Sequence, residues 1–154
     1  MLVGRIMSKR VVTTEENETL FHVLKKFVKY NISGVPVMRG KKLVGIVTES
    51  DIIGTIDAFS PKIHYDRATG FGVILAALKC GSCFEAAKKE MLGSRKLKVK
   101  AFMTRNPITI GPDETVEKAA RLMLKHKVNR LPVLKNGRLV GIIARADLVK
   151  ALEK

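Results

Sequence analysis

The sequence predicts an α+β fold in which two β-α-β-β-α repeats pack as a pseudo-two-fold pair, with an inserted helical segment between them. The first observation is a repeat at an offset of 96 residues: residues 6–51 align without a gap with residues 102–147, and 12 of these 46 positions are identical. A unit repeated in this way usually buries its apolar face by packing on its copy. The second observation is that both copies carry the same order of strand and helix patterns. The predicted divisions are 1–56, 57–98 and 99–154.

Each copy opens with a β-branched stretch, Val11–Thr14 in the first and Ile108–Ile110 in the second, which predicts a short strand. After Thr19 and after Thr115 the apolar residues recur at i, i+3, i+4, i+7 and i+8. This spacing is typical of an amphipathic helix, and the two threonines are the candidate N-caps.

Two more strands and a second helix complete each copy. The strands are predicted at Val35–Met38, Leu43–Val47, Leu131–Leu134 and Leu139–Ile143, and the helices are predicted to start near Glu49 and Arg145.

The insert between the copies reads as a helical hairpin. Phe71–Leu78 suits a helix that Gly81 ends, and a capping box then opens a second helix. The insert also holds Cys80 and Cys83, whose spacing suits half of a zinc site or a redox pair. Two thiols at a helix break or a structural disulfide are the simpler interpretation.

The net charge of +15 is unusually high, and it is spread as +4, +4 and +7 over the three divisions. Such a charge indicates either an acidic partner, nucleic acid included, or a lysine-rich solvated surface. The longest apolar stretch is far shorter than the roughly 20 residues that a membrane span needs. The N-terminus lacks a secretory signal pattern, so we expect a cytoplasmic protein.

Catalytic patterns are missing from the sequence. It holds no nucleophile elbow, no phosphate-binding Walker loop and no close pair of carboxylates in a plausible cleft. The sequence therefore favours a protein that is not an enzyme.

The order and repetition of the motifs resemble a pair of cystathionine-β-synthase (CBS) domains, the arrangement called a Bateman module. The features that carry the resemblance are Met7-Ser8 and Met103-Thr104, Gly34-Val35-Pro36-Val37 and Arg130-Leu131-Pro132-Val133, and the two Gly-x-x-x-x-x-Asp endings at Asp51 and Asp147. Such modules are non-catalytic, often form homodimers, and bind AMP, ADP, ATP or S-adenosylmethionine. The resemblance implies the same ligands here, with no required cofactor.

The resemblance also directs attention to particular side chains. Asp51 and Asp147 start helices, where a carboxylate can accept two hydrogen bonds from the cis-diol of a ribose. Thr48 can donate its hydroxyl to a phosphate, whereas Ala144 cannot, and Arg145 follows that alanine. These residues could instead be helix caps. The other candidates that line the ligand clefts are Arg130 for phosphates, Thr13 and Thr109 for adenine, and the polar residues Ser33 and Asn129.

We therefore expect a stand-alone sensor of cellular energy state that binds an adenosine-containing ligand between its repeats and signals to a separate partner chain. One alternative is a basic nucleic-acid-binding protein. Another is a metal- or thiol-dependent dimer through Cys80 and Cys83, with those two residues as the only candidate metal ligands.

Overall fold

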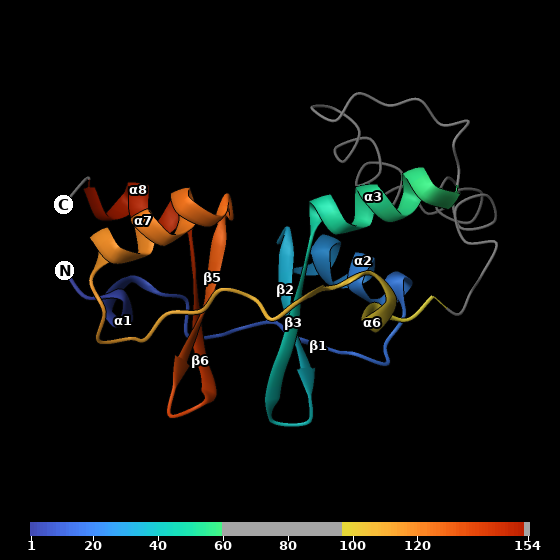
Figure 1. The fold of residues 1–154 in the computed structure, drawn as a ribbon, viewed down its shortest axis with the longest axis horizontal. Coiled ribbons are helices and arrows are strands. Elements are labelled where there is room, and N and C mark those ends of the chain that lie inside the picture. The colour runs from blue at the N-terminus through green and yellow to red at the C-terminus, as the bar shows by residue number, and fades with distance from the viewer. Residues whose placement is uncertain (60–96, 153–154) are drawn as a thin grey trace.

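The computed structural model describes residues 1–59 and 97–152. Figure 1 shows that they form two similar halves side by side, each built mostly from one repeat. The elements in chain order are α1 (Val3–Ile6), β1 (Thr14–Glu15), α2 (Leu20–Tyr30), β2 (Gly34–Arg39), β3 (Lys42–Thr48), α3 (Glu49–Phe59), α6 (Val99–Phe102), β4 (Thr104–Arg105), α7 (Val116–His126), β5 (Arg130–Lys135), β6 (Arg138–Ala144) and α8 (Arg145–Leu152). Among these described helices none is long and apolar enough to cross a membrane.

The two hairpins repeat each other residue for residue. In the first, Gly34 pairs with Thr48 on the antiparallel strands β2 and β3, and in the second Arg130 pairs with Ala144 on β5 and β6. Each hairpin has a register shift at the equivalent place, after Val37 and after Val133. The predicted second and third strands of both repeats are therefore confirmed.

The first long helix of each repeat begins where the pattern predicts. Thr19 and Thr115 are the N-caps of α2 and α7, and their hydroxyl oxygens accept backbone N–H groups three residues on. Each helix ends at a residue in the left-handed conformation, Asn31 or Lys127. The apolar stripe of α2 packs against its sheet, since Val23 and Phe27 are fully buried.

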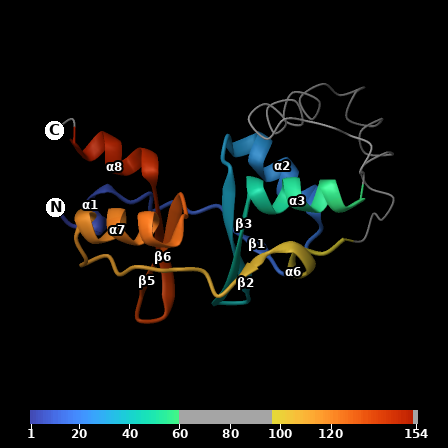
Figure 2. The same ribbon diagram turned by 45° about the horizontal axis from the view of Figure 1, so that its top comes forward.

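The short helix at the start of each repeat packs into the core of the other repeat. Val3 of α1 is buried with Met123 and Leu131 of the second repeat, whereas Val99 of α6 is buried with Phe27 of the first. Figure 2 shows α1 beside α7, and α6 below α3. The exchange is symmetric. It also includes backbone hydrogen bonds between the repeats, since the Val3 N–H donates to the Glu114 carbonyl, 2.8 Å.

The exchange continues into the sheets and corrects one sequence prediction. Val11–Thr14 forms no strand before Thr14, and the second repeat has only an isolated bridge from Ile110 to Val133 in that place. The chain there crosses between halves, where Thr104 pairs with Ile46 of the first repeat. Its β-branched residues pack as part of a crossing segment, since Val12 lies against the first core.

Most of the predicted insert lies in residues 60–96, outside the described residues. The two helices predicted there, and Cys80 and Cys83, fall in this range. The described part of the insert starts as the end of α3, which runs to Phe59.

Candidate functional site

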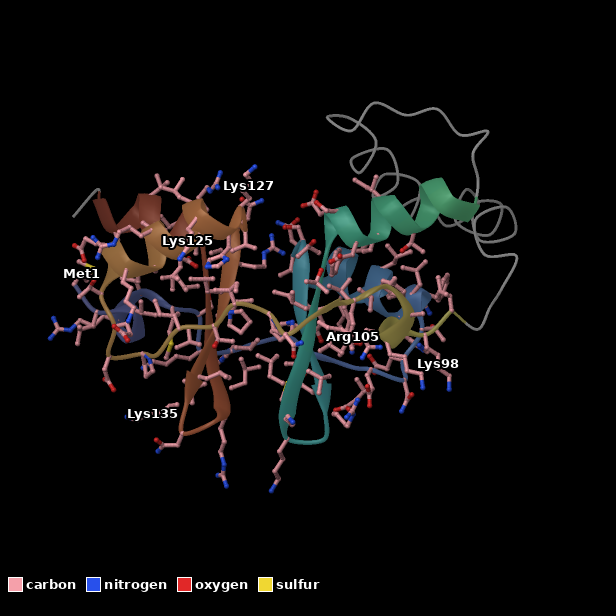
Figure 3. All side chains as sticks on the ribbon, in the orientation of Figure 1. Met1, Lys98, Arg105, Lys125, Lys127 and Lys135 are labelled. Carbon is pink, nitrogen blue, oxygen red and sulfur yellow. The ribbon has the colours of Figure 1, made fainter. Side chains whose placement is uncertain are left out.

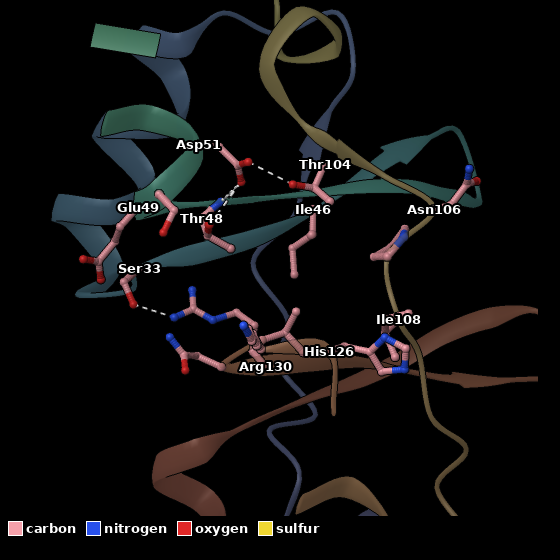
Figure 4. Close-up of a pocket in the computed structure, with 15 residues that line it drawn as sticks. Ser33, Ile46, Thr48, Glu49, Asp51, Thr104, Asn106, Ile108, His126 and Arg130 are labelled. Atoms are coloured by element: carbon pink, nitrogen blue, oxygen red, sulfur yellow. Dashed lines mark hydrogen bonds between the residues drawn. The ribbon is translucent and has the colours of Figure 1, made fainter. Parts of the chain in front are cut away.

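A cavity of about 500 Å³ opens where the first repeat meets the second. Four stretches of chain enclose it: the link between α2 and β2, the junction of β3 with α3, the crossing segment from β4 onward, and the link between α7 and β5 (Figure 4). The residues that line it are Ser33, Ile46, Thr48, Glu49, Ser50, Asp51, Thr104, Asn106, Pro107, Ile108, His126, Lys127, Val128, Asn129 and Arg130.

Asp51 forms the polar wall on the side of the first repeat. It is the third residue of α3, and its Oδ2 accepts the backbone N–H of Thr48, 2.8 Å, and the Thr48 hydroxyl, 3.1 Å. Its Oδ1 accepts the Thr104 hydroxyl, 2.9 Å. Asp51 therefore caps α3, as the helix-cap interpretation of the sequence predicts. It also lines the cavity. Both are compatible because each carboxylate oxygen can accept two hydrogen bonds.

Arg130 forms the facing wall, at the start of β5. Its Nη2 donates to the Ser33 hydroxyl, 2.7 Å, so the guanidinium reaches from the second repeat onto the first (Figure 4). Burial lowers the pKa of the Arg130 guanidinium, and the nearby Glu49 carboxylate acts in the opposite direction and raises it. Since an arginine stays protonated in proteins, the cavity holds a partly desolvated positive charge.

Apolar side chains lie between these two polar walls. Ile46 is 8% exposed, and Pro107, Ile108 and Val128 are half-buried. Such a surface suits a flat aromatic ring, whose faces gain from contact with aliphatic groups.

The structure brings five of the nine predicted site residues together. Thr48, Asp51, Ser33, Asn129 and Arg130 all line the cavity.

The other four predicted residues do not line this cavity. Thr13 is half-buried and its carbonyl accepts the Lys26 ammonium, 2.9 Å. Thr109 follows the lining residue Ile108 along the chain. Arg145 is exposed, and Asp147 caps α8 by accepting the Ala144 N–H, 2.8 Å. These last two are the equivalents of Glu49 and Asp51 in the second repeat.

Four polar lining residues of the second repeat were not predicted from the sequence. Thr104 and Asn106 come from the crossing segment, and His126 and Lys127 come from the end of α7. Both pairs are exposed. The signal that could have found Thr104 is its place in the Met103-Thr104 motif, which repeats Met7-Ser8. His126 carried no such signal, because it lies off the apolar stripe of its helix.

Within residues 1–59 and 97–152, no group of three or more His, Cys, Asp or Glu side chains could hold a metal ion. The basic residues labelled in Figure 3 are exposed and lie at separate places on both halves of the molecule. They are Lys98, Arg105, Lys125, Lys127 and Lys135.

A family model described as "CBS domain" matches residues 3–58 and 99–154. The chain is 39% identical over 154 residues to an uncharacterised protein, MJ1426, of Methanocaldococcus jannaschii, and covers 91% of it. It is 34% identical over 157 residues to a CBS domain-containing protein of Dictyostelium discoideum, and covers 92% of it. These matches cover 99% and 100% of this chain. The match to inosine-5'-monophosphate dehydrogenase of Korarchaeum cryptofilum, 28% identical over 90% of this chain, spans only 21% of that protein.

Solved structures of similar fold contain adenosine compounds. One is CBSX2 of Arabidopsis thaliana in complex with AMP, with a TM-score of 0.72 and 26% identity over 99% of this chain and 96% of that chain. Another is the CBS domain pair of protein MJ0100 in complex with 5'-methylthioadenosine and S-adenosyl-L-methionine, with a TM-score of 0.68, 26% identity and the same coverage.

Proposed function

This chain belongs to the CBS domain family as a tandem pair, and we propose that it is a regulatory module that binds an adenosine-containing ligand in the cavity between its repeats. The observation that carries the proposal is the placement of the Asp51 carboxylate and the Arg130 guanidinium on facing walls, with apolar side chains between them. No catalytic role is proposed for these residues.

The three parts of a nucleotide match the three surfaces of the cavity. The adenine ring would lie among Ile46, Ile108 and Val128. The ribose diol would donate to Asp51, whose Oδ1 holds one bond among the described residues, so that a second acceptor position is available. A 5' phosphate would pair with Arg130, since charge-assisted bonds from arginine to phosphate are strong and directional. The cavity volume also falls in the range of roughly 300–1,000 Å³ that is common for small-ligand sites.

The candidate ligands are AMP, ADP, ATP and S-adenosylmethionine, and no cofactor is required for binding. The ligands named for the similar CBS pairs, AMP in one and 5'-methylthioadenosine with S-adenosyl-L-methionine in the other, support this class. All of them contain the adenosine that the apolar surface and Asp51 would recognise.

The signal would arise because the cavity is built from both repeats. A ligand that contacts Asp51 on one side and Arg130 on the other favours one arrangement of the two halves over others, by the difference in its affinity for them. A separate partner chain would respond to that arrangement. Homodimer formation and a cytoplasmic location are parts of the same proposal.

Titration calorimetry with AMP, ATP, 5'-methylthioadenosine and S-adenosylmethionine tests the proposal. The informative variant is Asp51→Asn, which keeps an acceptor for the Thr48 N–H and so keeps the cap of α3. Its matched control is Asp147→Asn, because Asp147 caps α8 in the same way but lies outside the cavity. We expect wild type to bind at least one ligand at micromolar concentration and Asp51→Asn to weaken it at least about tenfold. The absence of binding to all four, or an equal loss in both variants, would overturn the proposal.

A further inference from the structure

The Arg130 guanidinium lies where a side chain of residue 34 would be, so its position requires a glycine there. A Cβ built on Gly34 would lie 1.8 Å from Nη1 and 2.7 Å from Cζ of Arg130. Contacts this short are not tolerated, and even an alanine at position 34 would displace the guanidinium. Gly34 and Arg130 occupy equivalent positions of the two repeats, 96 residues apart. The glycine in the first repeat leaves the space that the arginine of the second repeat fills.

Ser33 holds this guanidinium beside the first turn of α3. Its hydroxyl accepts Nη2 of Arg130, 2.7 Å, while its backbone carbonyl accepts the N–H of Glu49, 3.2 Å. The same residue therefore fixes a cationic side chain of the second repeat and the start of a helix of the first. Asn129, the equivalent of Ser33, accepts the Arg145 N–H of α8 through its carbonyl in the same way, 2.9 Å. The equivalent of Arg130 is Gly34, which has no side chain for Asn129 to bind.

The guanidinium is left with capacity for an anion. Arginine has five N–H donors, and within the described part of the chain the Arg130 side chain makes one hydrogen bond, to Ser33. The group is half-buried, so its other donors are not fully solvated. The neighbouring acidic group, Glu49, acts on it through Coulomb attraction without a hydrogen bond among the described contacts.

We propose that Ser33, together with Gly34, is a positioning residue that holds Arg130 where it receives the anionic 5' group of the ligand. This inference rests on the proposed function and narrows it, because it makes the ligand an adenosine 5'-phosphate rather than a neutral or cationic adenosine derivative. A guanidinium that is already placed loses less conformational freedom on binding, which raises affinity for the anion alone.

Calorimetry with AMP and 5'-methylthioadenosine tests this, because the two share a nucleoside and differ in charge at the 5' position. Ser33→Ala should weaken AMP binding about three- to tenfold, the value of one hydrogen bond to a positioned group, and change 5'-methylthioadenosine binding less than about twofold. Ser33→Thr keeps the hydroxyl and should restore AMP binding. Gly34→Ala should reproduce the selective loss by displacing Arg130.

Two further comparisons separate positioning from a general effect on the fold. In the Arg130→Gln background, Ser33→Ala should cause no additional loss of AMP affinity, because the group it positions is gone. Ser8→Ala removes a hydroxyl from a residue that does not line the cavity, and should leave the affinities for both ligands unchanged. Thermal unfolding of each variant checks that it is folded.

The inference is overturned if Ser33→Ala weakens both ligands equally, or if its effect on AMP persists undiminished in Arg130→Gln. Wild-type protein that binds 5'-methylthioadenosine as tightly as AMP would overturn the inference but leave the proposed function intact. Wild-type protein that binds neither, nor the other adenosine ligands, would instead overturn the proposed function itself.

Discussion

Asp51 and Thr104 join the two repeats by a direct hydrogen bond, 2.9 Å from the Thr104 hydroxyl to Asp51 Oδ1. Asp51 belongs to the first helical turn of α3 and Thr104 to β4, which pairs with β3 although it begins the second repeat. The carboxylate proposed to bind the ribose is therefore oriented by the other repeat before any ligand arrives. The equivalent pair, Asp147 and Ser8, has no such side-chain bond among the described contacts.

Thr104→Val should lower the free energy of unfolding by about 0.5–1.5 kcal/mol, the usual net value of one hydrogen bond, because it removes this bond. Ser8→Ala is the matched control and should have a smaller effect. Urea unfolding of both variants measures the difference. Equal effects would contradict a specific role for the Asp51–Thr104 bond.

Gly45→Ala should destabilise the protein by roughly 1–3 kcal/mol, since an added Cβ would lie 2.6 Å from Met103 Sδ and 2.9 Å from the Thr104 carbonyl oxygen. For Gly141→Ala the three atoms nearest the added Cβ all belong to the Met7 side chain, with Sδ at 2.4 Å, and a flexible methionine can move. The loss for Gly141→Ala should therefore be the smaller of the two. Denaturant midpoints in the reverse order would contradict this prediction, because the Thr104 backbone would then move more easily than the Met7 side chain.

Because α1 and α6 each pack into the other repeat, truncating a buried side chain of one repeat should leave a cavity in the core of the other. Val3→Ala should cost about 2 kcal/mol and raise amide hydrogen exchange most in α7, whereas Val99→Ala should raise it most in α2. Each variant is the control for the other. Exchange that rises in the repeat that contains the mutation, Val3→Ala loosening α2 and Val99→Ala loosening α7, would contradict the exchanged cores.

Much of this fold could be predicted from the sequence because its signals are local. The caps at Thr19 and Thr115, the apolar stripes after them and the two hairpins depend on residues within a few positions of each other. The exchange of α1 and α6 could not be predicted, because an apolar residue such as Val3 fits either of two similar cores equally well. Which core it enters depends on the path of the crossing segment.

The candidate site likewise combines residues that local sequence signals predict with residues that depend on the path of the crossing segment. Thr48 ends β3, Asp51 follows it in the first turn of α3, and Arg130 begins β5. All three could be predicted because they belong to the repeated motifs that carry the resemblance to CBS pairs. The misplaced strand at Val11–Thr14 had the same cause as the missed Thr104: in both repeats the chain before the first strand crosses to the other half, and a β-branched composition there reports burial rather than strand pairing.

The ion pair between Glu16 and Arg39 predicts a pH dependence of stability. Arg39 Nη2 donates to Glu16, 2.9 Å, and this bond lowers the pKa of the Glu16 carboxyl below its ordinary value, against a smaller opposing effect of burial. A carboxyl whose pKa is lower in the folded state stabilises the protein at neutral pH, and this contribution is lost as the pH falls through that pKa. The Tm difference between wild type and Glu16→Gln should thus shrink from about pH 7 to about pH 3. A difference that stays constant over this range would contradict the ion-pair account.

The most direct test of the central claim is where AMP binds, and methyl NMR of isoleucine-labelled protein can locate it. Ile46 lines the cavity, and its equivalent Ile142 in the second repeat does not. We expect AMP to shift the methyl resonances of Ile46 and Ile108, and Asp51→Asn to reduce these shifts at the same subsaturating AMP concentration. Shifts confined to Ile142, or AMP binding that leaves Ile46 and Ile108 unmoved, would contradict it.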